Sequence, residues 1–225
     1  MSKLVFDIET IGMDWESLDE TTQHSLSRWI EREAKDEGDL HAKMKDLKEG
    51  LGFSPLTGEI VAIGVYDVEK EKGVVYYQSP DKVTDVTEEE NFKFKPGTEA
   101  EILQNFWEGA KQYDEFISFN GRAFDAPFML IRSAVHKIRP SKDLMSYRYL
   151  GSQKFPTATS ATHVDLFDQL SFYGAVRRKG NLHLYCHAFG IESPKASGVT
   201  GDDVGELFKN KEYFKIAKLI SLIKC

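Results

Sequence analysis

Short hydrophobic runs along the chain predict the strands of a sheet. The first run, residues 3–8, is rich in β-branched and aromatic residues and has no helical period. Runs at 58–68 and 73–77 are separated by Glu-Lys-Glu-Lys, which predicts an antiparallel hairpin. Two further strands are expected at 115–119 and 163–166.

Hydrophobic residues at helical spacing predict helices between and after these strands. The expected helices are one opened by the capping box Thr98–Glu101 and running to about 112, one after Asn120-Gly121 that ends before Pro140, one at 182–189 stopped by Gly190, and one from about 213. The alternation of strands and helices predicts an α/β fold.

The charged residues 15–50 carry only scattered apolar positions. They predict one or two exposed helices inserted after the first strand. The chain shows no internal repeat, low-complexity tract or long linker. We therefore expect residues 1–225 to form a single domain with a charged helical insertion at about 13–55.

Composition and charge narrow the class of protein. The chain has 225 residues, 41% of them hydrophobic, and a net charge of −7. It lacks both the apolar run of a membrane span and a signal peptide, and its two cysteines cannot form a disulfide framework. We expect a cytoplasmic protein without a membrane partner. Residues 171–225 hold nine basic and five acidic residues. This basic segment indicates either a surface that binds phosphate groups or an ordinary solvated helical surface.

Asp7 and Glu9 are the first candidates for chemistry. They are one residue apart on the first predicted strand, so both carboxylates leave the same face. Two neighbouring carboxylates repel each other unless a proton or a cation lies between them. The pair therefore indicates either a divalent-metal site or a strand edge that faces solvent.

Asp125 is the third candidate carboxylate. It follows a predicted strand end and the Asn120-Gly121 turn, at the opening of a helix where an acid is favoured. An ordinary helix cap is the simpler interpretation. Because sites in α/β proteins assemble at strand ends, however, Asp125 could also join Asp7 and Glu9 there.

Two motifs carry a family resemblance. Phe6-Asp7-Ile8-Glu9-Thr10 and Asn120-Gly-x-x-Phe124-Asp125-x-Pro127 resemble the first two exonuclease motifs of the DEDD (DnaQ-like) superfamily. They look most like the predicted 3′-5′ exonucleases related to the proofreading domain of family B DNA polymerases. Residues 162–166 and 198–204 are similar to later segments of that group. The resemblance implies an RNase H-like mixed sheet flanked by helices.

The resemblance also implies a mechanism and a substrate. Two Mg²⁺ or Mn²⁺ ions would promote hydrolysis of phosphodiester bonds at the 3′ end of single-stranded DNA or RNA. Asp7 would bridge the ions, Glu9 would bind one of them and Asp125 the other. The terminal sugar and base would be positioned by Thr10, Asn120 and Phe124.

The third motif of the family is absent. It pairs a tyrosine or histidine with an aspartate one helical turn later, and here those positions hold Leu219 and Ile223. Three explanations stay open: an incomplete or frameshifted C-terminus, a degenerate nuclease, or a substitute acid. The substitutes are Asp165, which we prefer, and the pair Asp202 and Asp203.

The residues that could replace the missing third motif also have possible structural roles. Asp165 could instead cap a helix or bind backbone groups, and His163 beside it could be a base but fits a structural role better. The rival to an exonuclease is a catalytically inactive nucleic-acid-binding domain of the same fold.

Overall fold

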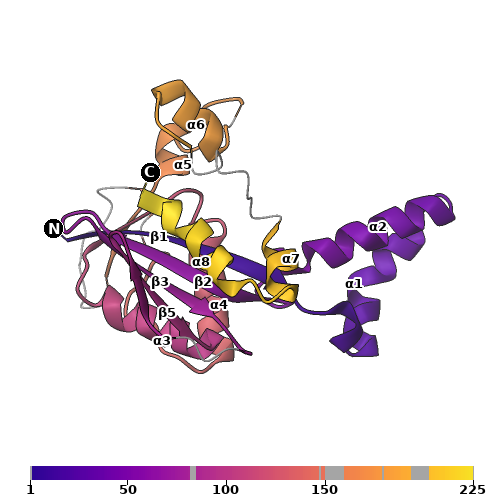
Figure 1. The fold of residues 1–225 in the computed structure, drawn as a ribbon. Helices are drawn as coiled ribbons and strands as arrows, with labels where there is room; N and C mark the ends of the chain where they lie inside the picture. Colours follow the sequence, from indigo (N-terminus) through magenta and orange to yellow (C-terminus); the bar gives the residue numbers. More distant parts are fainter. Residues whose placement is uncertain are drawn as a thin grey trace.

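The computed structural model describes residues 2–81, 85–146, 148–149, 160–178, 180–193 and 203–224. In this part of the chain it forms a mixed sheet with the strand order β4-β5-β3-β2-β1-β6-β7 (Figure 1). The strands are β1 (Lys3–Gly12), β2 (Gly58–Asp67), β3 (Lys72–Gln78), β4 (Thr87–Glu89), β5 (Phe92–Gly97), β6 (Glu115–Ser118) and β7 (Thr162–Asp165). β1 is antiparallel to β2 and parallel to β6, so the sheet changes from antiparallel to parallel pairing at β1.

Helices cover both faces of this sheet. α3 and α4 pack on one face, and α7 and α8 pack on the other (Figure 1). The α-helices are α1 (Glu20–Glu33), α2 (Glu37–Glu49), α3 (Glu99–Ala110), α4 (Asp125–Val135), α5 (Leu166–Leu170), α6 (Leu182–Phe189), α7 (Val204–Lys209) and α8 (Tyr213–Ile220). Short 3₁₀ turns are η1 (Trp15–Ser17), η2 (Gly50–Phe53) and η5 (Ser221–Lys224).

The two faces of β1 differ because its side chains alternate. Leu4, Phe6 and Ile8 are buried in the core beneath α3 and α4. Asp7 and Glu9 are only partly buried and leave the opposite face. The expectation that both carboxylates share one face of the first strand is confirmed.

Most predicted elements are present. The capping box forms as expected, since Thr98 Oγ1 accepts from the Glu101 N–H and Glu101 Oε2 accepts from the Thr98 N–H. Gly190 ends α6 in the left-handed conformation, with φ 69°. The insertion after β1 forms η1, α1, α2 and η2, and it extends beyond one end of the sheet (Figure 1). The sequence pattern did not predict β4, β5, α5 or α7.

A buried ion pair fixes α4 against α3. Both the Glu99 and Arg132 side chains are about 5% exposed, and Arg132 Nη2 lies 2.6 Å from Glu99 Oε2. Burial alone would raise the pKa of Glu99. The bonds from Arg132, from the Ile60 N–H and from His136 outweigh burial and hold that pKa below its ordinary value. The ion pair thereby sets the position of α4, whose first residue is Asp125.

No helix in the described residues is long and apolar enough to cross a membrane.

Candidate active site

The candidate site forms where β1 and β6 separate. β6 pairs only with Lys3–Val5, so the later backbone groups of β1 on that side have no strand partner. The Asp125 carboxylate fills part of this gap, because its Oδ1 accepts a hydrogen bond of 3.0 Å from the Ile8 N–H. Asp125 is 3% exposed. The helix start is thus fastened to the strand that carries Asp7.

Asp7 and Asp125 are hydrogen-bonded to each other through their carboxyl groups. Burial raises the pKa of Asp125 well above its ordinary value, and the negative charge of Asp7 raises it further. Burial also raises the pKa of Asp7. The two carboxyl groups form an acid dyad whose negative charge a cation could compensate in place of a proton.

Glu9 follows on the same face of β1. The pairing with β2 shifts between Glu9 and Thr10, because Glu9 lies opposite Ala62 whereas Thr10 lies opposite Ile60. Such bulges redirect side chains and are frequent beside active sites. Across the described residues, no three His, Cys, Asp or Glu side chains gather closely enough to hold a metal ion. The structure brings Asp7 and Asp125 into contact and leaves Glu9 outside that contact.

The Asn120 turn is held by Asp165. Asn120 adopts a left-handed backbone, with φ 64°. The Asp165 carboxylate, 3% exposed, accepts bonds from the N–H groups of Asn120, Arg122 and Phe167, at 2.8, 3.0 and 2.9 Å. Its acceptor atoms are therefore engaged in backbone contacts, the structural role that the sequence left open. Asp165 is not placed as a substitute metal ligand, and Asp202 lies outside the described residues.

Gly121 allows this turn to lie close to β6. A Cβ atom at position 121 would be 2.2 Å from Ser118 Oγ and 2.6 Å from Ser118 Cβ. Both distances are shorter than real Cβ contacts allow. Glycine is therefore required here by close approach.

His163 has the structural role that the sequence favoured. The ring is 1% exposed, with Nε2 2.7 Å from Ser118 Oγ and Nδ1 2.9 Å from the Leu144 carbonyl. Nδ1 must carry the hydrogen that it donates to this carbonyl, so the Ser118 hydroxyl donates to Nε2. Burial lowers the pKa of His163 to about 4, and the ring is neutral at pH 7.

η2 is contacted by a residue from each of the two candidate motifs, Thr10 and Phe124. Thr10 Oγ1 donates a 2.8 Å hydrogen bond to the Gly52 carbonyl and so ties η2 to β1. The neighbouring residue Phe53 is 70% exposed, and its ring centroid lies 6.5 Å from that of Phe124. Sequence reasoning missed Phe53, because no local pattern shows that the insertion returns to this site.

α8 lies across the face from which Asp7 projects. Asp7 pairs with Gly64 in the sheet, and a Cβ atom at Gly64 would be only 3.0 Å from Ile220 Cγ1. Leu219 and Ile223 are half-buried and pack with the core on this face. α8 and η5 therefore carry apolar side chains, Leu219 and Ile223, at the two positions that the sequence comparison assigned to the third motif.

Comparison with known proteins identifies the family to which the chain belongs. Residues 57–220 match the model of a family described as predicted 3′-5′ exonuclease related to the exonuclease domain of PolB. The chain belongs to this family. The PolB-related exonuclease match covers Asn120, Phe124 and Asp125, whereas β1 with Asp7 and Glu9 precedes the matched range. No curated protein matches the sequence.

A solved structure shows the fold. The family B DNA polymerase from the hyperthermophilic archaeon Pyrobaculum calidifontis matches all of this chain with a TM-score of 0.53 at 14% identity. The chain spans 23% of that polymerase. The expected RNase H-like α/β fold, a mixed sheet flanked by helices, is confirmed, as is membership of the PolB-related exonuclease family.

Proposed function

We propose that this protein is a metal-dependent 3′-5′ exonuclease that removes nucleotides from single-stranded DNA or RNA. The observation that carries the proposal is the contact between Asp7 and Asp125, made where β1 and β6 separate. Two carboxyl groups in contact cost free energy, and such arrangements are concentrated at functional sites. Family membership indicates the kind of site, because Asp125 lies within the stretch that matches the exonuclease family, and Asp7 lies in a motif that resembles one of that group.

The residues present fit a divalent cation. Asp7 and Asp125 offer only oxygen atoms, which suit Mg²⁺ or Mn²⁺, and the raised pKa values of both carboxyl groups mark a place where positive charge is favoured. These two residues would hold an ion, and Glu9 would supply a carboxylate from the same face for a second. The bound ions would act as Lewis acids at the scissile phosphate and favour ionisation of the attacking water.

The other residues of the site would position the strand. The rings of Phe53 and Phe124 form an aromatic pair on which the terminal base would stack without sequence preference. Asn120 would orient the terminal sugar from the turn that Asp165 holds. Thr10 would hold η2, and hence Phe53, in place.

A catalytically inactive nucleic-acid-binding domain is the second candidate. Leu219 and Ile223 favour it, because neither side chain can orient water or bind a metal ion. Under this alternative the acid pair still binds a divalent ion and the strand still docks, but no bond is cleaved.

Release of mononucleotides from a 5′-labelled single strand in Mn²⁺ separates these candidates. A ladder shortened from the 3′ end, and lost in Asp7→Ala, supports the exonuclease. Asp14→Ala, which removes an acid at η1 outside the site, is the matched control and should keep the activity. Strand binding without any shortening in the parent would establish the inactive binding domain instead.

A further inference from the structure

The segment formed by residues 166–178 and 180–191 stands away from the body of the molecule (Figure 1). We call it the α5–α6 lobe. It exposes large apolar side chains: Phe172 is 72% exposed, Phe189 60% and Tyr173 36%. Phe189 is one of the hydrophobic residues whose helical spacing predicted the helix at 182–189, yet its side chain is exposed. Several exposed large apolar residues within one short segment are typical of an interaction site.

The charge of the lobe is opposite to that of the chain. From Gln169 to Ile191 the sequence contains no aspartate or glutamate, although the whole chain carries a net charge of −7. Arg177 and Arg178 are exposed, and neither guanidinium forms an ion pair with any described residue. A surface that combines exposed rings with arginines is complementary to single-stranded nucleic acid, which offers bases and phosphates.

The rings are presented by a strained turn. Phe172 and Tyr173 both adopt left-handed backbone conformations, with φ 49° and 53°. Such a conformation is unfavourable for a residue other than glycine. Bonds from the Tyr173 N–H to the Asp168 carbonyl (2.7 Å) and from the Val176 N–H to the Ser171 carbonyl (3.2 Å) maintain it. The turn keeps both aromatic side chains at the surface.

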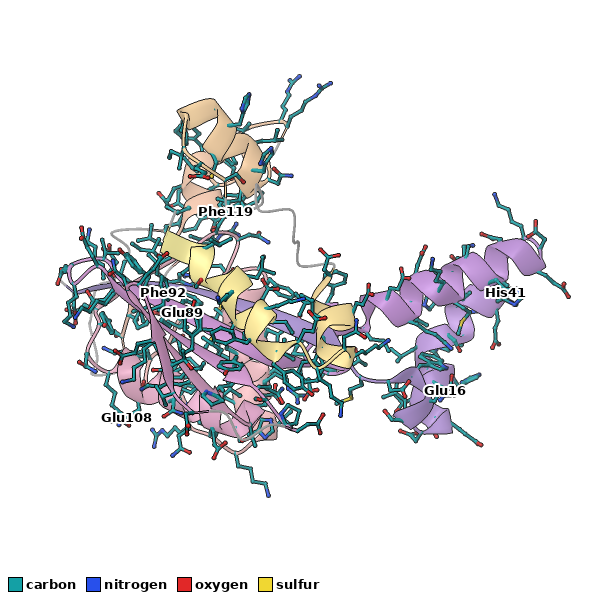
Figure 2. All side chains as sticks on the ribbon, in the orientation of Figure 1. Glu16, His41, Glu89, Phe92, Glu108 and Phe119 are labelled. Atoms are coloured by element: carbon teal, nitrogen blue, oxygen red, sulfur yellow. The ribbon has the colours of Figure 1, made fainter. Side chains whose placement is uncertain are left out.

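The lobe is continuous with the candidate active site. Asp165 bonds the Asn120 turn and also caps the start of α5. Phe119, the residue before Asn120, lies where the lobe joins the body (Figure 2). Its ring centroid is 6.0 Å from that of Tyr185, which in turn is 6.3 Å from that of Phe189. A line of rings thus leads from Phe119, beside the Asn120 turn, to Phe189 at the C-terminal end of α6.

We propose that the α5–α6 lobe binds the single-stranded segment that precedes the 3′-terminal nucleotide. Its bases stack on Phe172, Tyr173 and Phe189, and its phosphates contact Arg177 and Arg178. This inference rests on the proposed exonuclease function, because it takes the 3′ end to lie at Asp7 and Asp125. The continuity of the rings with the site favours a nucleic acid over an acidic protein as the occupant.

The test compares two triple variants. The lobe variant is Phe172→Ala/Arg177→Ala/Arg178→Ala. The matched control, Val135→Ala/Lys137→Ala/Arg139→Ala, removes one exposed apolar and two exposed basic residues at the end of α4. Binding is measured by fluorescence anisotropy in an Asp7→Ala background, with oligothymidylates of about 3 and about 12 nucleotides. Nucleotide release is measured without that background.

For the longer strand we expect the lobe variant to raise Kd and KM by roughly tenfold or more, whereas the control leaves both unchanged. The shorter strand should bind almost equally to all three proteins. The dependence of binding on salt should weaken in the lobe variant, because two phosphate contacts are lost. Circular dichroism should show unchanged folding, since all the replaced side chains are exposed.

Other outcomes would overturn the proposal. An unchanged Kd for the longer strand would remove the lobe from the binding surface while leaving the exonuclease function in place. Displacement of the strand by polyglutamate as readily as by unlabelled oligothymidylate would show a site for acidic proteins. If no nucleotide is released by the parent but the lobe variant still loses binding, the exonuclease function fails and the lobe surface stands.

Discussion

The Asp125 carboxylate accepts a 3.0 Å hydrogen bond from the Ile8 N–H. The two residues are 117 positions apart in the sequence, and the bond joins the start of α4 to the strand residue that follows Asp7. The same carboxyl group bonds Asp7, so Asp125 both organises the site and adds a buried acid to it.

Asp125→Asn should stabilise the metal-free protein and reduce its nuclease activity. Asparagine keeps an oxygen for the Ile8 N–H and supplies an amide hydrogen to Asp7, while it removes the possibility of two negative charges in contact. We expect the free energy of unfolding without metal to rise by about 1 to 2 kcal/mol at pH 7. Urea denaturation with EDTA measures it, and Asp125→Ala, which loses both bonds, should be destabilised instead.

Gly121→Ala should disrupt the turn that holds Asn120. The new Cβ would collide with Ser118 Oγ, and relief of this contact would break the bond from Ser118 to His163. We expect a loss of about 2 to 4 kcal/mol in stability. Gly205→Ala on α7 is the control, because nothing lies within 4 Å of its added Cβ, and it should be neutral or stabilising. Equal melting temperatures for the two variants would contradict the role of the turn.

The double variant Leu219→Tyr/Ile223→Asp should gain nuclease activity over the parent. Both positions lie on the segment that covers Asp7 through the contact of Ile220 with Gly64. A hydroxyl and a carboxylate there would orient water and hold metal more firmly, effects worth roughly 10²-fold or more each. Nucleotide release in Mn²⁺ measures the gain, and adding Asp7→Ala should abolish it. A parent as fast as the double variant would mean that another group already performs both tasks.

Phe53→Ala should weaken the binding of single-stranded substrate with little effect on stability. The ring is 70% exposed, so its removal costs little packing, whereas stacking of a base on an aromatic ring contributes about 1 to 3 kcal/mol. We expect KM for nucleotide release to rise by roughly fivefold or more. Leu56→Ala, three residues away and 74% exposed, should leave KM unchanged. A similar change in both variants would indicate that any apolar loss on this loop has the same effect.

His163 should make the fold sensitive to mild acid. Its pKa is lowered by burial from 6.5 to about 4, so between these values the unfolded chain binds a proton that the folded protein does not. Stability is therefore lost as pH falls through this window, by up to about 3 kcal/mol. Melting temperatures from about pH 7 to pH 4 should fall less steeply in His163→Asn than in the parent. His24→Gln, at an exposed position on α1, should keep the slope of the parent.

The sequence predicted those parts of the fold that local patterns determine. The first strand, the hairpin of β2 and β3, the capping box of α3 and the glycine stop of α6 all depend on residues close together in the chain. β4 could not be recognised, because its three residues Thr87–Glu89 are all exposed and carry no hydrophobic signal. β5 joins the sheet through parallel pairing with β3, and local sequence patterns do not show this non-local contact.

The candidate site was only partly predictable for the same reason. The alternation rule placed Asp7 and Glu9 on one face, but the contact of Asp7 with Asp125 depends on how β1 and β6 diverge. The role of Asp165 is decided by the Asn120 turn, 45 positions earlier. Phe53 reaches the site through the tie from Thr10 to Gly52, which no periodicity shows.

The two outer strands of the sheet, β4 and β7, are both short. β4 has three residues and β7 has four, whereas β1 and β2 in the middle have ten each. An outer strand leaves a row of unpaired backbone groups to which another chain can add, and short or charged edges limit this association. β4 carries Glu88 and Glu89 on its exposed length. The long hydrophobic strands of this protein are thereby shielded from edge-to-edge aggregation between molecules.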